Sequence, residues 1–171
     1  MGAISFEGQV VVITGGGGGL GSAFARELAR RGAKVVVNDL GGSVTGEGSE
    51  TSTTFADQVV SDIRAVGGTA VANHDSVVTT EGSRRIIEAA LTNFGRVDAV
   101  IANAGTMRFG DFVNLTLDDL NALLSVHVGG SWNIAQAAWP HMKQQGYGRI
   151  VLATSSGGTL GCPPSAPMAQ I

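Results

Sequence analysis

The chain has 171 residues, 43% of them hydrophobic, and its 11 basic and 14 acidic side chains give a formal net charge of −3. These values place it among globular proteins and argue against nucleic acid or an anionic membrane surface as the main partner. No apolar run approaches the roughly 18–20 residues that cross a bilayer, and the N-terminus lacks the basic and apolar regions of a secretory signal.

Apolar, β-branched runs alternate with amphipathic segments along the chain. In the first half, this pattern predicts strands at 9–14, 34–39 and 69–73, each followed by a helix, at 20–32, 55–66 and 80–94. Between the second strand and its helix, the polar Gly/Ser/Thr stretch 41–54 is predicted to be a loop. It is long enough to be mobile or to lie over a ligand.

In the second half, two further strands, 97–103 and 149–155, flank one long helix. Thr116 and Asp119 have the spacing of a capping box at its start, and Pro140 is expected to bend or shorten its last turns. Continuous apolar strands separated by helices predict a Rossmann-type, doubly wound α/β fold with a parallel sheet of order 3-2-1-4-5. With no repeat and no linker, residues 1–171 are expected to form a single domain.

A run of glycines, TGGGGGLG (Thr14–Gly21), lies between the first strand and the first helix. Free backbone N–H groups at the positive end of a helix suit the pyrophosphate of a dinucleotide. A flexible loop without a ligand is the alternative. However, Asp39 ends the second strand 18 residues after Gly21, close to the roughly 20 expected of the acidic residue that binds the ribose hydroxyls.

The charge of Asp39 also bears on the choice of cofactor. A carboxylate accepts hydrogen bonds from a ribose diol and repels a 2′-phosphate, and no Arg or Lys stands beside it or in the glycine run to reverse that preference. The sequence therefore favours NAD over NADP. An Asp39 that only solvates a strand end is the alternative.

Five segments in sequence order, TGGGGGLG, VVVNDLGG, NHDSV, FGRVDAVIANAG and YGRIVLATSS, together resemble the short-chain dehydrogenase/reductase family, over roughly residues 8–161. Within it, VVVNDLGG, the pair Val126–His127 and AAWPHMKQQGYGRI most resemble the (3R)-hydroxyacyl-CoA dehydrogenase units of multifunctional β-oxidation enzymes. The resemblance implies NAD(H)-dependent hydride transfer between an alcohol and a ketone. It also implies a small-molecule alcohol, ketone or acyl-CoA as substrate.

The resemblance assigns cofactor-binding residues along the chain. They are Gly15, Gly19, Leu20 and Gly21 in the cofactor loop, Asp39 at the ribose, Asp75, Ser76 and Val77 near the adenine, and Asn103, Ala104 and Gly105 beside the nicotinamide ribose. For the last three, a simple strand-ending turn is the alternative. His74 and His141 are read as loop or surface residues, and with no third ligand nearby no metal site is expected.

Catalysis in the family uses a Ser and a Tyr-x-x-x-Lys motif, in which the Lys lowers the pKa of the Tyr. Ser156 matches the serine, with Ser155 as a rival, and His127 stands where an Asn usually completes the proton relay. His127 is either a relay residue or a core histidine. The tyrosine position is Ala169, the lysine would lie beyond Ile171, and no Tyr-x-x-x-Lys occurs in the chain.

Two interpretations follow from this mismatch. The chain is an oxidoreductase that lacks the C-terminal part of its fold and is inactive in this form, or it is a non-catalytic NAD-binding module; a different scheme that uses Ser156 and His127 is the least favoured alternative. An apolar fifth strand and the long helix would be left uncovered, so a homo-oligomer is expected. The single cysteine, Cys162, is read as a structural or incidental thiol and fits a cytoplasmic location.

Overall fold

A computed structural model of the protein describes residues 4–41 and 54–155. Within these residues, five parallel strands form one sheet in the order β3-β2-β1-β4-β5, which confirms the predicted Rossmann-type topology. The strands are β1 (Val10–Thr14), β2 (Lys34–Asn38), β3 (Thr69–Asn73), β4 (Ala99–Ala102) and β5 (Arg149–Leu152). β4 and β5 are shorter than the sequence pattern suggests.

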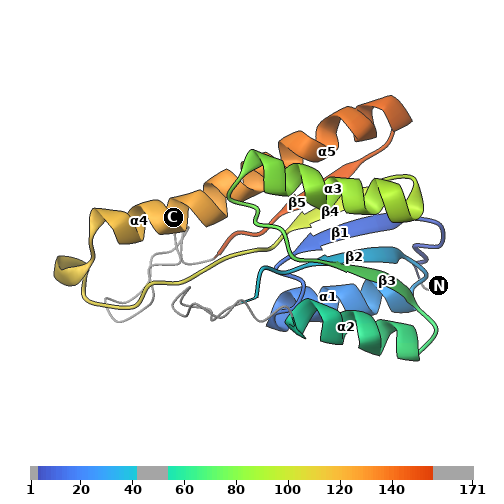
Figure 1. Cartoon of the computed structure of the whole chain (residues 1–171), viewed down its shortest axis with the longest axis horizontal. Coiled ribbons are helices and arrows are strands. Elements are labelled where there is room, and N and C mark those ends of the chain that lie inside the picture. Colours follow the sequence, from blue (N-terminus) through green and yellow to red (C-terminus); the bar gives the residue numbers. More distant parts are fainter. Residues whose placement is uncertain (1–3, 42–53, 156–171) are drawn as a thin grey trace.

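Helices cover both faces of this sheet (Figure 1). α1 (Gly19–Arg30) and α2 (Thr54–Ala65) lie on one face, and α3 (Thr80–Phe94) and α5 (Ser131–Gln145) lie on the other. The short helix α4 (Leu117–Leu124) extends beyond the edge of the sheet, at the left of the view. This arrangement follows from right-handed crossovers between parallel strands.

Alternation along the central strands divides the core into two apolar clusters. Val11 and Ile13 of β1 pack on the face covered by α1 and α2, together with Ile63 of α2. Val10 and Val12 pack on the opposite face, against residues of α3 and α5. Because successive side chains of a strand point to opposite faces, a run of β-branched residues serves both layers at once.

The predicted long helix exists, but it is not a continuous α-helix. Thr116 opens it with the expected capping box, in which Thr116 Oγ1 accepts the N–H of Asp119 at 3.2 Å and Asp119 Oδ2 accepts the N–H of Thr116 at 2.9 Å. A π-helical segment, η2 (Ser125–Gly130), then separates α4 from α5. Pro140 lies inside α5, which continues to Gln145, so of the two effects expected of Pro140, a bend or a shortening, the helix is not shortened.

Two further points complete the description. A short 3₁₀ turn, η1 (Phe112–Asn114), precedes α4 and was not predicted. In the parts of the chain that the structure describes, no helix is long and apolar enough to cross a membrane. Three predictions fall on residues that the structure does not describe: most of the loop predicted over 41–54, the candidate Ser156, and Cys162.

Candidate functional site

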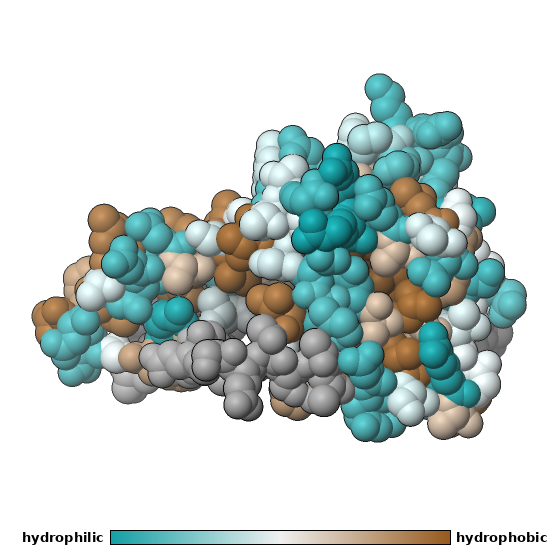
Figure 2. All heavy atoms as spheres, viewed as in Figure 1, coloured by the Kyte–Doolittle hydropathy of each residue, from teal (hydrophilic) through white to brown (hydrophobic). Residues whose placement is uncertain are grey.

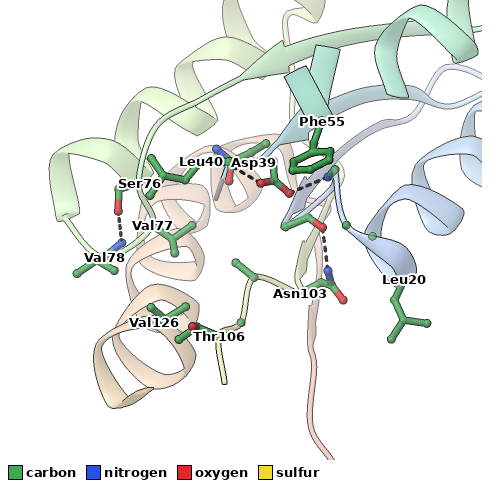
Figure 3. A pocket seen from close by; sticks show the side chains of 18 of the residues that line it. Leu20, Asp39, Leu40, Phe55, Ser76, Val77, Val78, Asn103, Thr106 and Val126 are labelled. Atoms are coloured by element: carbon green, nitrogen blue, oxygen red, sulfur yellow. Dashed lines mark hydrogen bonds between the residues drawn. The ribbon is translucent and has the colours of Figure 1, made fainter. Parts of the chain in front are cut away.

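A cavity of about 770 Å³ opens at the carboxyl ends of the strands (Figure 3). Its walls come from six places in the chain: the glycine loop, the end of β2, the start of α2, the segment after β3, the segment after β4, and the long helix. Ligands of open parallel sheets bind at this edge, where the strand order reverses between β1 and β4. All of the predicted cofactor residues line it: Gly15, Gly19, Leu20, Gly21, Asp39, Asp75, Ser76, Val77, Asn103, Ala104 and Gly105.

The glycine loop packs so tightly on the end of β4 that two of its glycines are required by the fold itself. Gly15 has φ +64°, and a Cβ there would stand 2.9 Å from Ala104 Cα. A Cβ on Gly21 would collide with the carbonyl oxygen of Gly15. Gly19 differs, because a Cβ there would meet nothing within 4 Å. These contacts fix the start of α1 beside the cavity.

The N-terminus of α1 offers its backbone N–H groups to the cavity. Its N-cap, Gly18, provides no side-chain cap, and no acidic residue lies in the first turn. The orphan N–H groups and the positive end of the helix dipole therefore lack a side-chain acceptor, as expected of a pyrophosphate site. Leu20, in the same turn, is exposed and lines the cavity.

Asp39 lies at the end of β2, and each of its carboxylate oxygens accepts a hydrogen bond from a glycine N–H. Oδ2 accepts the N–H of Gly17 at 2.9 Å and Oδ1 accepts that of Gly41 at 2.9 Å. Figure 3 shows the carboxylate inside the cavity beside the ring of Phe55. Gly17 was not singled out by the sequence pattern, although a Cβ there would stand 2.9 Å from Asp39 Oδ2 and 2.8 Å from Phe55 Cβ.

The carboxylate of Asp75 is held by protein groups. Arg85 Nε donates to Oδ1 at 2.6 Å and Asn73 Nδ2 donates to Oδ2 at 2.8 Å. Burial raises the pKa of Asp75, but these hydrogen bonds and the charge of Arg85 outweigh it and hold the pKa below its usual value. Buried Asn38, which sequence reasoning missed, donates to the carbonyl of Asp75 at 2.9 Å and so fixes the start of the segment after β3.

Asn103 ties the end of β4 to the glycine loop. Its Nδ2 donates to the carbonyls of Thr14 and Gly15, both at 3.2 Å, while its own N–H donates to Thr14 Oγ1 at 3.1 Å. Ala104 donates its N–H to the same hydroxyl at 3.1 Å. Asn103 therefore fixes the glycine loop directly against the end of β4, where both segments line the cavity.

His127 lies in the π-helical segment, against the chain that lines the cavity. Its Nε2 is 2.8 Å from the carbonyl oxygen and 3.2 Å from the N–H nitrogen of Thr106. One nitrogen cannot donate and accept at once, and the shorter distance favours donation from Nε2 to the carbonyl. A Cβ on Gly105 would stand 2.8 Å from the ring, so Gly105 makes room for this histidine.

Two more features bear on the catalytic residues. Ser156 lies outside the described residues, and its neighbour Ser155 follows the end of β5. Arg108, which the sequence reasoning did not single out, contributes a cationic side chain to the cavity wall, and its Nε lies 3.3 Å from Asp119 Oδ1. Within residues 4–41 and 54–155, no three His, Cys, Asp or Glu side chains gather in a way that could hold a metal ion.

Comparisons with known proteins agree with this geometry. A structure described as a short chain dehydrogenase from Mycobacterium avium superimposes with a TM-score of 0.80 at 32% identity, over 94% of this chain and 56% of that one. An NAD⁺-bound xylitol dehydrogenase gives a TM-score of 0.83 at 26% identity, over 95% and 58% of the two chains.

Curated relatives are closer in sequence. Peroxisomal multifunctional enzyme A of Dictyostelium discoideum is 48% identical over 93% of this chain and 35% of its own length. A short-chain type dehydrogenase/reductase of Mycobacterium tuberculosis is also 48% identical, over 91% of this chain and 54% of its own, so the chain spans about half the length of that relative. The family model described as short chain dehydrogenase matches residues 9–167. The chain therefore belongs to the short-chain dehydrogenase family.

Proposed function

We propose that the chain forms the cofactor-binding part of an NAD(H)-dependent oxidoreductase that transfers a hydride between an alcohol and a ketone. The carboxylate of Asp39 carries this proposal, because it lies in the cavity close to the uncapped N-terminus of α1. One end of the cavity thus suits a ribose diol, and the helix end suits the adjoining pyrophosphate. A negative charge at Asp39 disfavours the 2′-phosphate of NADP.

The residues around the cavity fit such a dinucleotide. Asp39 would accept hydrogen bonds from the ribose, the first turn of α1 would bind the pyrophosphate, and Leu20 would cover it from the apolar side. The wall from Asp75 to Val78 would flank the adenine, and the stretch from Asn103 to Gly105 would flank the nicotinamide ribose. The cofactor, when bound, supplies the ring that accepts or gives up the hydride.

The acid/base groups determine whether these residues can turn over a substrate. Ser156 is the proposed hydrogen-bond donor to the substrate oxygen and His127 the proposed relay residue. The chain has Tyr147 as its single tyrosine and contains no Tyr-x-x-x-Lys. Proton transfer of this kind contributes about 10²–10⁴-fold to rate, so we propose that the 171-residue chain binds cofactor without turning over substrate. The same observation favours the second candidate, a non-catalytic NAD-binding module.

The substrate class rests on relatives. Peroxisomal multifunctional enzymes are similar to this chain, and the residues around Val126–His127 resemble their hydroxyacyl-CoA dehydrogenase units. We therefore propose a 3-hydroxyacyl-CoA as the substrate of the oxidoreductase to which these residues belong. Residues 1–171 as a single domain, a cytoplasmic location and a homo-oligomeric state are further parts of the proposal. Cell fractionation tests the location against the peroxisome named for several relatives.

Calorimetric titration with NAD and NADP tests the proposal directly. We expect NAD to bind more tightly than NADP, and no reduced cofactor to form when a 3-hydroxyacyl-CoA or a simple secondary alcohol is added. Absence of NAD binding by folded protein would contradict the cofactor assignment. Turnover by the purified chain would contradict only the claim that it lacks a working acid/base group.

A further inference from the structure

The segment Ser76–Val78, immediately after the adenine-side Asp75, forms an irregular wall of the cavity. Ser76, Val77 and Val78 all line it, and none belongs to a helix or strand (Figure 3). Ser76 Oγ accepts the N–H of Val78 at 3.3 Å, which shapes the turn locally. The carbonyl groups of the turn need partners from elsewhere, because no sheet or helix ladder passes through it.

Asn133 of α5 supplies those partners. Its Nδ2 donates to the carbonyl of Val77 at 3.1 Å and to that of Val78 at 3.0 Å. A side-chain amide carries two N–H hydrogens, so both bonds form at the same time. The two carbonyls lie more than 50 residues away in sequence, with separations of 56 and 55. Asn133 therefore joins the cavity wall to the long helix.

Other residues of α3 and the π-helical segment hold the same turn in place. Ser83 Oγ, buried on α3, donates to the carbonyl of Val77 at 3.1 Å. Gly130 packs against Val77 so closely that a Cβ there would stand 2.7 Å from Val77 Cγ2. The wall is thus held from α3 and from the long helix together. Asn133 is the group that holds both carbonyls of the turn.

Comparison with Asn93 shows how this role differs from that of an asparagine that bonds only within its own helix. Asn93 Nδ2 also donates to a backbone carbonyl, that of Ala89 at 2.8 Å, but this bond stays within α3 on the exposed surface. Asn133 is half-buried, and both of its carbonyl partners belong to residues that line the cavity. The bond of Asn93 satisfies its own helix, whereas the bonds of Asn133 set the position of a binding surface.

We propose that Asn133 is a positioning residue for the dinucleotide, which holds the Val77–Val78 wall at the distance from the glycine loop that the cofactor requires. This inference rests on the proposed NAD site. Without the two amide hydrogen bonds, the turn would sample wider positions and the bound cofactor would lose contact with it. Cofactor affinity would fall although Asn133 itself touches no part of the cavity surface that the cofactor occupies.

The test compares Asn133→Leu with the matched control Asn93→Leu. We expect Asn133→Leu to weaken NAD binding by about tenfold, the size of one to two neutral hydrogen bonds, while Asn93→Leu leaves it within about twofold of the original. Asn133→Asp, which keeps the shape but places a carboxylate against two carbonyls, should weaken binding at least as much. NAD binding is measured at a temperature at which the melting curves show both leucine variants to be fully folded, which excludes global unfolding as the cause.

Amide hydrogen exchange gives a readout that does not need the cofactor. In Asn133→Leu, the peptide that contains Ser76–Val78 should exchange several-fold faster, with α3 and β1 unchanged; in Asn93→Leu it should not. Equal exchange and equal NAD affinity in the two leucine variants would overturn the inference. If the unsubstituted protein fails to bind NAD, the proposed function fails, and the exchange comparison still decides whether Asn133 holds the wall.

Discussion

The carboxylate of Asp39 and the backbone N–H of Gly17 form a hydrogen bond of 2.9 Å between two segments 22 residues apart. This bond fixes the glycine loop to the end of β2, and the N–H of Gly41 holds the other carboxylate oxygen at 2.9 Å. Since a carboxylate oxygen has more than one lone pair, Asp39 can keep both bonds and still accept hydrogen bonds from a ligand. The same residue therefore shapes the loop and is free to play the ribose-binding role that we propose for it.

Replacing Asp39 by Asn should change cofactor preference. The amide nitrogen would face one of the two glycine N–H donors, and the negative charge that repels a 2′-phosphate would be gone. We expect NAD affinity to fall about tenfold, because hydrogen bonds to charged groups contribute about 1.5–3 kcal/mol, and the NAD/NADP affinity ratio to fall as well. Calorimetry measures both. Asp57→Asn, an exposed change on α2 outside the cavity lining, is the control; an unchanged NAD/NADP ratio in Asp39→Asn would contradict the assignment.

An alanine substitution should destabilise the fold at Gly21 but not at Gly19. At Gly21 the new Cβ would collide with the carbonyl oxygen of Gly15, which can move only with the backbone. We expect a loss of about 1–3 kcal/mol or more in the free energy of unfolding. At Gly19 the Cβ meets nothing within 4 Å at the start of α1, so alanine should be neutral or stabilising by up to about 1 kcal/mol. Urea denaturation without cofactor measures the free energy of unfolding of both variants. Equal losses in the two would contradict the packing of the glycine loop described above.

The sequence predicted the strands and helices because their signals are local: β-branched runs, amphipathic spacing and caps such as Thr116 with Asp119. The strand order then followed from the rules for right-handed crossovers in parallel α/β sheets. The π-helical segment was not predictable in this way. Its residues His127 and Gly130 contact Thr106 and Val77, which are distant in sequence and give no local signal.

The same distinction holds for the site. Asp39 was predicted because a carboxylate at a strand end after a glycine run has a recognisable spacing. Gly17 and Asn133 were not predicted, because only the fold brings their partners near them. The partner of Gly17 is the carboxylate of Asp39, and the partners of Asn133 are backbone carbonyls. Periodicity and composition contain no signal for a bond from a side chain to a distant backbone group.

Acid should weaken the fold partly through Asp75. Its pKa is lowered in the folded protein, since the hydrogen bonds from Arg85 and Asn73 outweigh burial. The unfolded chain therefore binds more protons near the ordinary carboxylate pKa of about 3.9, so stability is present above that pH and is lost as pH falls through the folded pKa. In Asp75→Asn, the free energy of unfolding should fall less steeply below about pH 4, by at most about 1.4 kcal/mol per pH unit.

The partner residue provides the check for this prediction. Arg85→Leu removes the Nε donor that lies 2.6 Å from Asp75 Oδ1, so it should flatten the same part of the pH profile. Combining the two substitutions should add little to either alone, because they break one interaction. Parallel profiles for the unsubstituted protein and Asp75→Asn, from neutral pH down to the acid transition, would contradict the role of this pair.

His127 has a structural part that can be measured without any substrate. Its Nε2 lies 2.8 Å from the carbonyl oxygen of Thr106, and His127→Leu leaves that half-buried carbonyl without the ring donor. We expect a loss of about 0.5–1.5 kcal/mol in the free energy of unfolding, with a smaller loss for His141→Leu near the other end of α5. A His127→Leu variant as stable as the original would favour a purely catalytic role for this residue.

Apolar side chains remain on the surface of the long helix and of the edge strand β5. Trp132 and Trp139 of α5 are 68% and 62% exposed, and Leu152 of β5 is 56% exposed. Apolar residues also gather on the surface around α4, at the left of Figure 2, where Phe112 is 81% exposed. Exposed aromatic residues on one helix, and a strand that is the last of its sheet within the described residues, are typical of surfaces that associate.

We therefore expect the protein to self-associate through α5 and β5. Sedimentation velocity over a range of concentrations should show species larger than a monomer, and Trp139→Lys should shift the distribution towards monomer because it places a charge in the proposed contact. Val66→Lys, a charge at an exposed position just after α2 on the opposite face of the sheet, is the matched control and should leave the distribution unchanged. A monomer at every concentration would remove the proposed homo-oligomer, whereas equal dissociation by both lysine variants would show that the contact does not involve α5.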